Sequence, residues 1–458
     1  MRTLLINAPT FGSHFYSAPL GLGYIAACLE KDAKAVEILD ADLSGNWQRL
    51  RREVLRREFQ VAGISTMTHN FYDALALARL IKAKDPKITV VLGGVHPTCL
   101  PEETAREKDV DFVIVGEGES SLPALLEALE GKKSLEEIPG LCFERDGQIH
   151  LRKQELIGNL DSLPFPAYHL LHLERYGQAP HGAYFRQAPF VTMLTSRGCP
   201  FRCAFCANSV LTGGKWRARS PENVLDEIEY LVKEWGVREI HFEDDNLTLD
   251  RKRVIAICKG IIERGLKIWW KCPDGVHIGT LDEEVLVWMH KAGCYSLAFG
   301  IESVNERILH NIHKEVNREK VRRVVKCAKE LGIYTVGFFI FGLPGETPRT
   351  VRETINFAKE TDLDSAQFNL CVPFPGTEIF DLYKKKGYIK VDDLRKYDVD
   401  HVLVELEGLS AQALASWRRR AFLEFYLRFG VLWRNFRQIT STRVIASLFR
   451  RLRHIAWG

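Results

Sequence analysis

The sequence has no long hydrophobic run and little excess charge of either sign. Nowhere do about eighteen apolar residues, the length that a membrane-spanning helix needs, follow one another, so no such helix is predicted. Residues 3–8 are apolar, but no cleavage site follows them, and we expect no secretory signal peptide. The net charge of +4 indicates no particular partner. Because the rest of the chain has no basic stripe like the one near its C-terminal end, we do not expect nucleic acid to be a partner.

The cysteines do not have the pattern of a disulfide framework. There are eleven, an odd number, and they are scattered along the chain. Such usage is typical of a reducing compartment, so we expect a cytoplasmic protein. With 46% hydrophobic and 27% charged residues, the composition is that of a folded globular protein. A chain of 458 residues is too long for one ordinary core, and two or three domains are expected.

Short apolar runs alternate with helical segments in two parts of this α/β chain. In residues 1–131 the alternation predicts a doubly wound, Rossmann-like parallel sheet. Residues 132–188 form a connector, with a hairpin that turns at Asp146-Gly147 and a proline-rich stretch after it. In residues 189–390 six strands alternate with longer helices and predict a partial (β/α) barrel. Residues 391–458 are expected to be a helical, basic extension.

Three cysteines on one short segment form the strongest chemical pattern. Cys199, Cys203 and Cys206 have C-x-x-x-C-x-x-C spacing and follow the apolar run 190–194 directly. Three thiolates on one loop can hold three corners of a four-iron, four-sulfur (4Fe-4S) cluster and leave the fourth iron open. The alternatives are a zinc knuckle or three unrelated thiols. A closed zinc site needs four ligands, usually with a second cysteine pair, and no such pair follows.

Polar or glycine-rich segments also follow the other predicted barrel strands. Catalytic groups of parallel barrels project from the carboxyl ends of the strands, so these segments are candidates for the site. They are E-D-D at 243–245 after the second strand, F-G-I-E-S at 299–303 after the fourth, F-G-L-P-G-E-T at 341–347 after the fifth, and P-F-P-G-T at 373–377 after the sixth. In the fifth, Thr347 is expected to cap the following helix.

With Phe205 directly before the third cysteine, these segments resemble the radical S-adenosylmethionine (radical SAM) superfamily. The resemblance implies that the open iron chelates the amino and carboxylate groups of SAM. An electron from the cluster then breaks an S–C bond and releases a 5′-deoxyadenosyl radical. It also implies SAM-contacting roles for several residues at the strand exits. These are Glu243 and Asp244 at the SAM amino group, Glu302 and Ser303 near SAM, and Gly342 beside the adenine.

Loops with hydroxyls and glycines follow three strands of the first domain: Ser65-Thr66, Gly93-Gly94 and Gly116-Glu117. Turn glycines of an ordinary α/β fold would explain each loop alone, and no G-x-G-x-x-G of a dinucleotide site follows the first strand. Taken together, S-T-x-T, G-G-V-H-P-T and V-D-F-V-I-V-G-E-G-E resemble the cobalamin-binding domain that precedes many radical SAM cores. The resemblance implies that these six loop residues lie at a cobalamin site.

Cobalamin-binding folds that ligate cobalt with a histidine carry D-x-H-x-x-G after the first strand. This chain has G-S-H-F-Y-S at 12–17, so His14 lacks both the aspartate and the glycine. We therefore expect no histidine on the lower face of cobalt. For His69 and His96 we expect hydrogen-bonded or solvated roles rather than metal ligation. Cys272 and Cys371, at two barrel strand exits, are interpreted as buried apolar residues, with a role inside the barrel as the alternative.

The C-terminal extension is rich in arginine and aromatic residues. Between 417 and 453 there are ten arginines and a single acid, Glu424, with aromatic residues interleaved at helical spacing. Such helices can lie in a membrane interface, with arginine stems along the apolar surface. The alternative is a helix that packs on the barrel and keeps a solvated basic face. Both remain open, and so does a peripheral location at the membrane.

The magnesium-protoporphyrin cyclases, the hopanoid enzymes and the class B radical SAM methyltransferases share the architecture that this chain resembles. The resemblance implies methyl transfer to an unactivated carbon of a small-molecule or lipid-like substrate. One SAM would methylate cobalt and a second would supply the radical, with a flavodoxin or ferredoxin as electron donor. A non-methylating ring-forming, ring-contracting or oxidative reaction is the first alternative. A cobalamin-binding sensor without catalysis is the second, and the complete cysteine triad argues against it.

Overall fold

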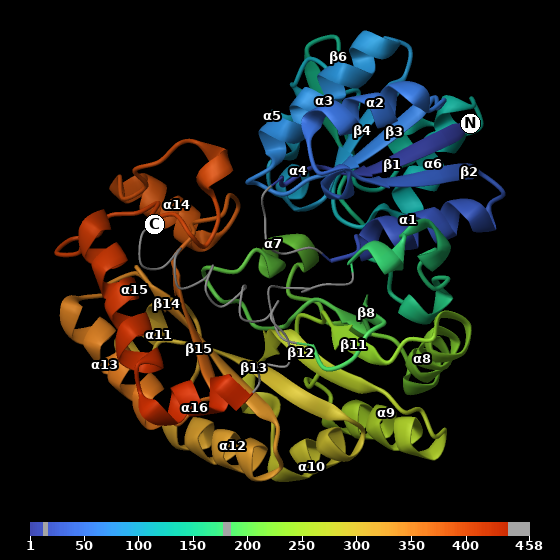
Figure 1. Cartoon of the computed structure of the whole chain (residues 1–458). Helices are drawn as coiled ribbons and strands as arrows, with labels where there is room; N and C mark the ends of the chain where they lie inside the picture. The colour runs from blue at the N-terminus through green and yellow to red at the C-terminus, as the bar shows by residue number, and fades with distance from the viewer. Residues whose placement is uncertain (12–16, 177–184, 438–458) are drawn as a thin grey trace.

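The computed structural model describes residues 1–11, 17–176 and 185–437. It contains two large sheets, and in the view of Figure 1 one lies above the other. The N-terminal sheet is drawn in blue and the second sheet in green to orange. The prediction for His14 and the part of the tail beyond residue 437 lie outside the described residues.

The first sheet has the strand order β2-β1-β3-β4-β5-β6-β7. Its parallel strands are β1 (Arg2–Asn7), β2 (Ala35–Asp40), β3 (Val61–Ser65), β4 (Thr89–Gly93) and β5 (Phe112–Ile114). The predicted doubly wound sheet is therefore confirmed. The predicted hairpin is β6 (Leu141–Arg145) and β7 (Gln148–Leu151), and β6 pairs antiparallel with β5. The first sheet thus continues into the segment that the sequence assigns to the connector.

Helices cover both faces of this sheet. On one face lie α1 (Leu20–Lys31) and α6 (Gly118–Leu129), and on the other α2 (Trp47–Arg56) and α3 (Phe71–Lys84). Because side chains alternate along a strand, Leu5 of β1 packs in the α1 cluster, whereas Leu4 and Ile6 pack in the α2 cluster. The α1 cluster runs on without a break into the core of the second sheet. The two domains therefore share one hydrophobic core.

The second sheet has the order β15-β14-β13-β12-β11-β8, and all its strands are parallel. They are β8 (Phe190–Met193), β11 (Glu239–Phe242), β12 (Trp269–Val276), β13 (Cys294–Glu302), β14 (Tyr334–Phe341) and β15 (Ser365–Leu370). Helices between the strands lie on the outside of the curved sheet (Figure 1). These are α8 (Pro221–Trp235), α9 (Arg251–Glu263), α10 (Glu283–Lys291), α12 (Arg318–Glu330) and α13 (Pro348–Glu360). The six-stranded partial barrel is confirmed.

Local sequence explains how these helices begin. Ser220 caps α8 by accepting a hydrogen bond from the backbone of Asn223, and a proline stands in the first turn. Thr347 and Thr350 form a reciprocal capping box at the start of α13, so the predicted cap is confirmed. Caps of this kind fix where each helix begins, so the residues between a strand and its helix form loops that are available for a site.

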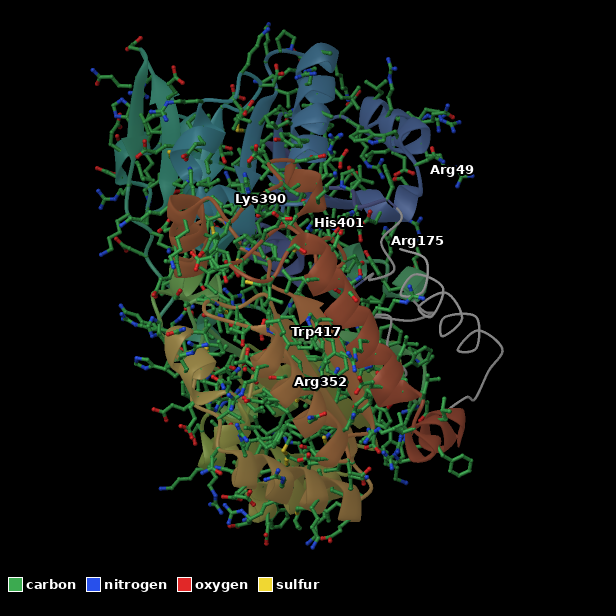
Figure 2. The ribbon with its side chains drawn as sticks, turned by 90° about the vertical axis from the view of Figure 1, so that its left-hand side faces the viewer. Arg49, Arg175, Arg352, Lys390, His401 and Trp417 are labelled. Atoms are coloured by element: carbon green, nitrogen blue, oxygen red, sulfur yellow. The ribbon has the colours of Figure 1, made fainter. Side chains whose placement is uncertain are left out.

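The first helix of the C-terminal extension packs on the barrel. Phe422 and Phe425 of α15 (Ala411–Tyr426) contact Phe368 of β15, with ring centroids 5.5 and 6.1 Å apart. Figure 2 shows Trp417 of α15 beside Arg352 of α13, and the two form a cation–π contact at 4.9 Å. The packed-helix alternative therefore holds for α15. It is followed by α16 (Phe429–Arg437). Among the described residues, no helix has both the length and the apolar character needed to cross a membrane.

Candidate active site

The three cysteines lie on one loop that begins after β8. The loop contains β9 (Ser196–Arg197), α7 (Asn208–Thr212) and β10 (Arg217–Ala218), and β9 pairs antiparallel with β10. Cys199, Cys203 and Cys206 are half-buried free thiols. Burial raises the pKa of each thiol, that of Cys206 to about 11, and the charge of a neighbouring cysteine raises each pKa further. Each thiol of the triad is therefore influenced by the charge of another member.

Two of the acids after β11 hold the start of this loop. The Asp244 carboxylate is 2% exposed and accepts hydrogen bonds from the backbone N–H and the hydroxyl of Thr195, at 3.0 and 2.7 Å. It also accepts one from the hydroxyl of Ser196. Asp245 accepts from the backbone N–H of Gly198, directly before the first cysteine, at 2.8 Å. The Asp244 carboxylate thus forms its hydrogen bonds within the protein. The SAM contacts implied for Asp244 and Glu243 stay predictions.

A buried ion pair lies beside the cysteine loop. Lys314 Nζ donates to Glu302 Oε1 at 2.9 Å, and both side chains are 8% exposed. Glu302, the last residue of β13, adopts a φ of 61°, a left-handed conformation that is uncommon for residues other than glycine. A Cβ at Gly300 would lie 2.6 Å from Glu302 Oε1 and 2.9 Å from Lys314 Nζ, so glycine leaves the space for the pair. The positive charge of Lys314 lowers the pKa of all three cysteines against the effect of burial.

The sequence did not single out Lys314. A lysine in a loop is more often solvated than buried, and nothing in its spacing marks it. The signal that could have found it is its place twelve positions after Glu302, in the loop that the G-I-E-S segment leads into. The backbone supports this place, because Ala204 N–H of the cysteine loop donates to Ile312 O at 3.1 Å.

The other residues assigned by resemblance lie around the same loop. Phe205 is half-buried, and its ring is 5.9 Å from Lys314 Nζ. Ser303 is fully buried and accepts a hydrogen bond from the backbone of Asn305 at 3.3 Å. Gly342 adopts a φ of +88°, and a Cβ there would be 3.5 Å from Cys371 Cβ. The SAM contacts implied for these residues stay predictions.

Phe201, inside the cysteine motif, stacks on His277 with ring centroids 3.9 Å apart and an interplanar angle of 13°. Burial, together with the charges of Lys314 and Lys320, lowers the pKa of His277 to about 4. A neutral imidazole therefore lies against the loop. The sequence did not identify this contact, since His277 is 76 positions away and carries no motif.

The polar loops of the first sheet meet at its carboxyl edge. Thr66 N–H donates to Gly93 O at 2.9 Å. Thr98 Oγ1 donates to Gly94 O at 2.7 Å and accepts from Gly116 N–H at 2.9 Å. Gly94 has a φ of +99°, and a Cβ there would lie 2.6 Å from Thr66 O, so only glycine lets these loops approach so closely.

This edge lies against the cysteine loop. Ser65 ends β3 at the same level as Gly93 of β4. The short helix α4 (Val95–Cys99) follows β4 and contacts α7, the helix directly after the third cysteine (Figure 1). A Cβ at Gly376 would be 3.4 Å from Cys99 Cβ and 3.5 Å from Val210 of α7. The loops of the first sheet, where cobalamin is expected, thus lie against the cysteine loop, where the cluster and SAM are expected.

His96 is buried in α4, which follows β4, and His69 is half-buried in the loop that follows β3. His96 is 2% exposed, its ring centroid is 4.1 Å from that of Phe71 in a tilted arrangement, and its Nδ1 lies 3.3 Å from the hydroxyl of Thr68. Burial lowers its pKa to about 4, so its ring is neutral. Burial also lowers the pKa of His69. Cys272 and Cys371 are 3% and 2% exposed and belong to the hydrophobic core, as expected of apolar cysteines.

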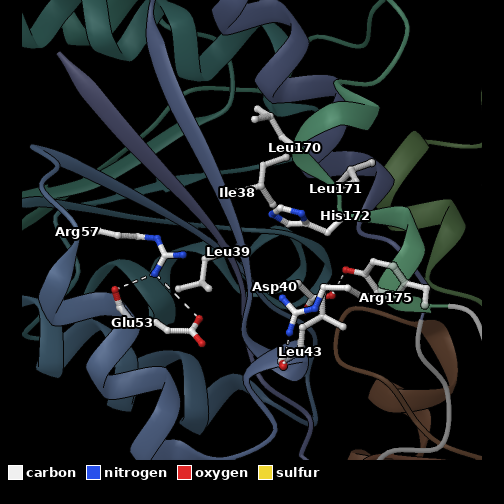
Figure 3. Close-up of a pocket in the computed structure, with 11 residues that line it drawn as sticks. Ile38, Leu39, Asp40, Leu43, Glu53, Arg57, Leu170, Leu171, His172 and Arg175 are labelled. Carbon is white, nitrogen blue, oxygen red and sulfur yellow. Dashed lines mark hydrogen bonds and ion pairs between the residues drawn. The ribbon is translucent and has the colours of Figure 1, made fainter. Parts of the chain in front are cut away.

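A small hollow lies elsewhere, between β2 and the connector (Figure 3). It has a volume of about 40 Å³ and is lined by Asp40, Arg57, His172 and Arg175, among others. The hydroxyl of Tyr176 donates to Asp40 Oδ2 at 2.5 Å across it. A substrate pocket usually has about 300 Å³ or more, whereas one water occupies about 30 Å³. This hollow therefore has room for water only.

The donor groups fit the cofactors that the resemblance implies. Within the described ranges, no three His, Cys, Asp or Glu side chains lie close enough together to hold a single metal ion. Three thiols on one loop suit the separate irons of a cluster, and the buried cation of Lys314 offsets the negative charge of thiolates. At the edge of the first sheet, Gly94 O, the Thr98 hydroxyl and the Gly116 N–H bond one another and order the loops at which the resemblance places cobalamin.

Two family models match the chain. Residues 193–358 match the radical SAM superfamily, and residues 12–126 match the B12 binding domain. An uncharacterized methyltransferase of Pyrococcus horikoshii is 36% identical, and the match covers 94% of each chain. The cytidylyl-2-hydroxyethylphosphonate methyltransferase of Streptomyces wedmorensis is 31% identical over 85% of this chain and 82% of that protein.

A third relative is the anaerobic magnesium-protoporphyrin IX monomethyl ester cyclase of Rubrivivax gelatinosus. It is 28% identical over 88% of this chain and 73% of that protein. Among solved structures, the radical S-adenosylmethionine methyltransferase TsrM of Kitasatospora setae, with cobalamin and a [4Fe-4S] cluster bound, has the same fold. Its TM-score is 0.69 at 22% identity, and 84% of this chain and 75% of that chain are covered.

Proposed function

Because the chain belongs to the radical SAM superfamily and carries a B12 binding domain, its cofactors are a 4Fe-4S cluster, SAM and cobalamin, and we propose that it methylates an unactivated carbon of a small-molecule or lipid-like substrate. The observation that carries the proposal is the contact between α4 of the first sheet and α7 of the cysteine loop. Both cofactors would then act on one substrate at this junction. Its relatives are enzymes, and a sensing role is not retained.

When bound, the cluster and SAM supply a 5′-deoxyadenosyl radical, and cobalamin supplies the methyl group. The chain holds these groups and orients them. Cys199, Cys203 and Cys206 would bind three irons, while the backbone and hydroxyls around Thr66, Gly94 and Gly116 would line the cobalamin site. The electron for SAM cleavage comes from outside the chain, and we propose a flavodoxin or ferredoxin as its source.

The Glu302–Lys314 pair would receive the amino-acid end of SAM. That end carries one ammonium and one carboxylate, and the pair offers one charge of each sign beside the cysteine loop. Burial keeps both side chains in place, so little freedom is lost when SAM binds. In this proposal the two residues exchange part of their mutual contact for contacts with SAM.

Lys314→Gln is expected to raise the KM for SAM at least about 30-fold, because truncating one member of a buried charge pair in a binding site costs about 2–5 kcal/mol. Initial rates of 5′-deoxyadenosine formation measure the effect, and iron content shows whether the cluster is retained. Lys326→Gln, an exposed lysine of α12, is the matched control. An unchanged KM in a Lys314→Gln enzyme with full iron content would remove Lys314 from the SAM site.

Ring formation or oxidation without methyl transfer is the second candidate, favoured by the 28% identity to a cyclase. Product stoichiometry separates the two. After anaerobic reconstitution with SAM, reductant and a pool of candidate substrates, methyl transfer is expected to give S-adenosylhomocysteine and 5′-deoxyadenosine in equal amounts. 5′-Deoxyadenosine alone would favour the second reaction. If neither compound forms, both proposals are wrong.

We also propose peripheral contact with an anionic lipid surface. The structure describes thirteen exposed large hydrophobic residues, and four of them lie within ten positions of one another. These four form the C-terminal apolar patch: Leu423, Leu427, Phe429 and Leu432. Phe429 is 81% exposed and Leu427 is 68% exposed. Arg419 is exposed on α15, the helix that carries Leu423, and arginines at 443, 450, 451 and 453 follow in the sequence. Such a combination favours an anionic lipid surface.

The triple substitution Leu427→Ser, Phe429→Ser and Leu432→Ser is expected to abolish flotation with anionic vesicles, since the buried apolar area supplies part of the binding energy. The wild-type chain is expected to float with these vesicles and less with neutral ones. Leu55→Ser, at an exposed leucine of α2, serves as the control. Membrane contact through this patch is excluded if the wild type itself remains with the unbound protein.

A further inference from the structure

Two arginines enclose the segment that carries all three cysteines. Arg197 belongs to β9 and Arg217 to β10, and the two residues are direct partners in the small antiparallel ladder. The residues between them, 198–216, include the cysteine triad and α7. The ladder has only two residue pairs, so it is too short to fix this segment by itself.

Both arginines bind the same carboxylate of the first domain. Arg197 Nη1 donates to Glu117 Oε1 at 3.0 Å, and Arg217 Nη1 donates to both Glu117 oxygens at 2.9 Å. Arg197 Nη2 also donates to Glu119 Oε1 at 2.5 Å. The exposed fractions of the four side chains are 16% for Arg197, 10% for Arg217, 12% for Glu117 and 5% for Glu119. Two cations thus face two anions in a nearly closed junction.

The Glu117 carboxylate is turned toward the barrel and away from its own helix. It stands at the N-terminal end of α6 but makes no capping hydrogen bond there. It accepts instead from the two arginines and from the backbone N–H of Ile157 in the connector, at 2.7 Å. Arg217 Nη1 completes the arrangement by donating to Ile157 O at 2.8 Å. One carboxylate therefore joins the loop after β5, the connector and both ends of the cysteine segment.

A second contact runs beside this one. Gln154 Nε2 donates to Leu211 O of α7 at 3.2 Å. A Cβ at Gly116 would lie 1.7 Å from Gln154 Oε1, so the glycine directly before Glu117 leaves the space through which this side chain reaches α7. Glu117 therefore binds the two arginines that flank the cysteine segment, and Gly116 leaves the space for the Gln154 side chain that binds α7.

From these contacts we infer that Glu117, Arg197 and Arg217 are positioning residues that hold the cysteine segment in a fixed place relative to the first domain. The inference rests on the proposed function for its consequence. If the radical forms at the cysteine loop and the methyl group comes from the first domain, their separation has to match one substrate. A displacement of about 1 Å in such an arrangement can cost about 100-fold in rate. Loss of the junction would uncouple radical formation from methyl transfer without removing either cofactor.

Arg217→Leu tests the inference, because Arg217 lies outside the residues proposed to touch a cofactor. The variant is expected to retain iron, cobalamin and the KM for SAM. Its ratio of 5′-deoxyadenosine to methylated product is expected to rise about tenfold or more. Arg217→Lys is expected to restore much of the coupling, because a single nitrogen, Nη1, makes all the contacts described. Arg238→Leu, at an exposed arginine, controls for the loss of charge.

Hydrogen–deuterium exchange gives a readout that does not depend on turnover. Residues 198–216 of the Arg217→Leu chain are expected to exchange faster than those of the wild type, with the rest of the barrel unchanged. Unchanged exchange and an unchanged product ratio would overturn the inference. So would a parallel loss of both products together with lost iron, because that result assigns a structural role only. If the wild type makes no methylated product, the proposed function fails while the exchange result still decides whether the junction holds the segment.

Discussion

Cys203→Ala is expected to lower the rate of SAM cleavage at least about 1000-fold. Loss of a group that merely supports a metal ligand already costs about 10–100-fold in affinity or activity, and loss of a direct ligand costs more. Cys203 is the central member of the triad, and the charges of both Lys314 and Glu302 act on its thiol. Without it, two cysteines would have to hold a cluster that needs three.

The measurement is 5′-deoxyadenosine formation under reducing, anaerobic conditions, together with iron and sulfide content and the electron paramagnetic resonance signal of the reduced cluster. Cys327→Ala is the matched control, because Cys327 is also a half-buried free cysteine but lies on α12. The control is expected to keep wild-type iron content and activity. A Cys203→Ala enzyme that still cleaves SAM at the wild-type rate would refute the assignment of the cluster to this loop.

Asp244→Asn is expected to have the next largest effect, which is a loss of stability. The buried carboxylate accepts three hydrogen bonds from Thr195 and Ser196, and an amide nitrogen in place of one oxygen leaves at least one donor without an acceptor. Leaving a buried partner of a charged group unsatisfied costs about 3 kcal/mol. We expect the melting temperature of the chain without cofactors to fall by about 5 °C, and the reconstituted protein to retain less iron.

The result separates two roles for this acid. If Asp244 bound only the SAM amino group, as the resemblance implies, the substitution would raise the KM for SAM and leave the melting temperature unchanged. Asp226→Asn is the control, since Asp226 is an exposed acid of α8 and its side chain is 59% exposed. A surface substitution of this kind changes stability little. A melting temperature equal to that of the wild type would show that the hydrogen bonds of Asp244 do not hold the loop.

The architecture could be predicted from the sequence because the patterns that indicate it involve residues close together in the chain. Alternation between strand and helix along the chain predicted the parallel strands of both sheets. Thr347 could be assigned as a cap because its partner lies three positions away. The cysteine triad was equally local. Each of these features depends on neighbours that can be read directly from the chain.

The electrostatic contacts could not be predicted in the same way. Arg197 and Arg217 meet Glu117 across 80 and 100 positions, and either arginine alone looks like an ordinary surface residue. Lys314 binds Glu302, whose left-handed backbone conformation has no local signal in the sequence. The resemblance places Glu117 at a cobalamin site, which stays a prediction, and it did not indicate that the carboxylate binds two arginines of the barrel. Pairing across domains depends on tertiary geometry, which no local spacing encodes.

Transfer of a labelled methyl group from SAM to a substrate is the reaction on which the proposed function depends. The reconstituted chain would be supplied with SAM bearing a trideuterated methyl group, a reductant and candidate substrates, and its products analysed by mass spectrometry. We expect a product in which one trideuteromethyl group replaces a hydrogen of the substrate, formed only when cobalamin is present. Accumulation of 5′-deoxyadenosine with no labelled product from any substrate that is consumed would contradict the proposed function.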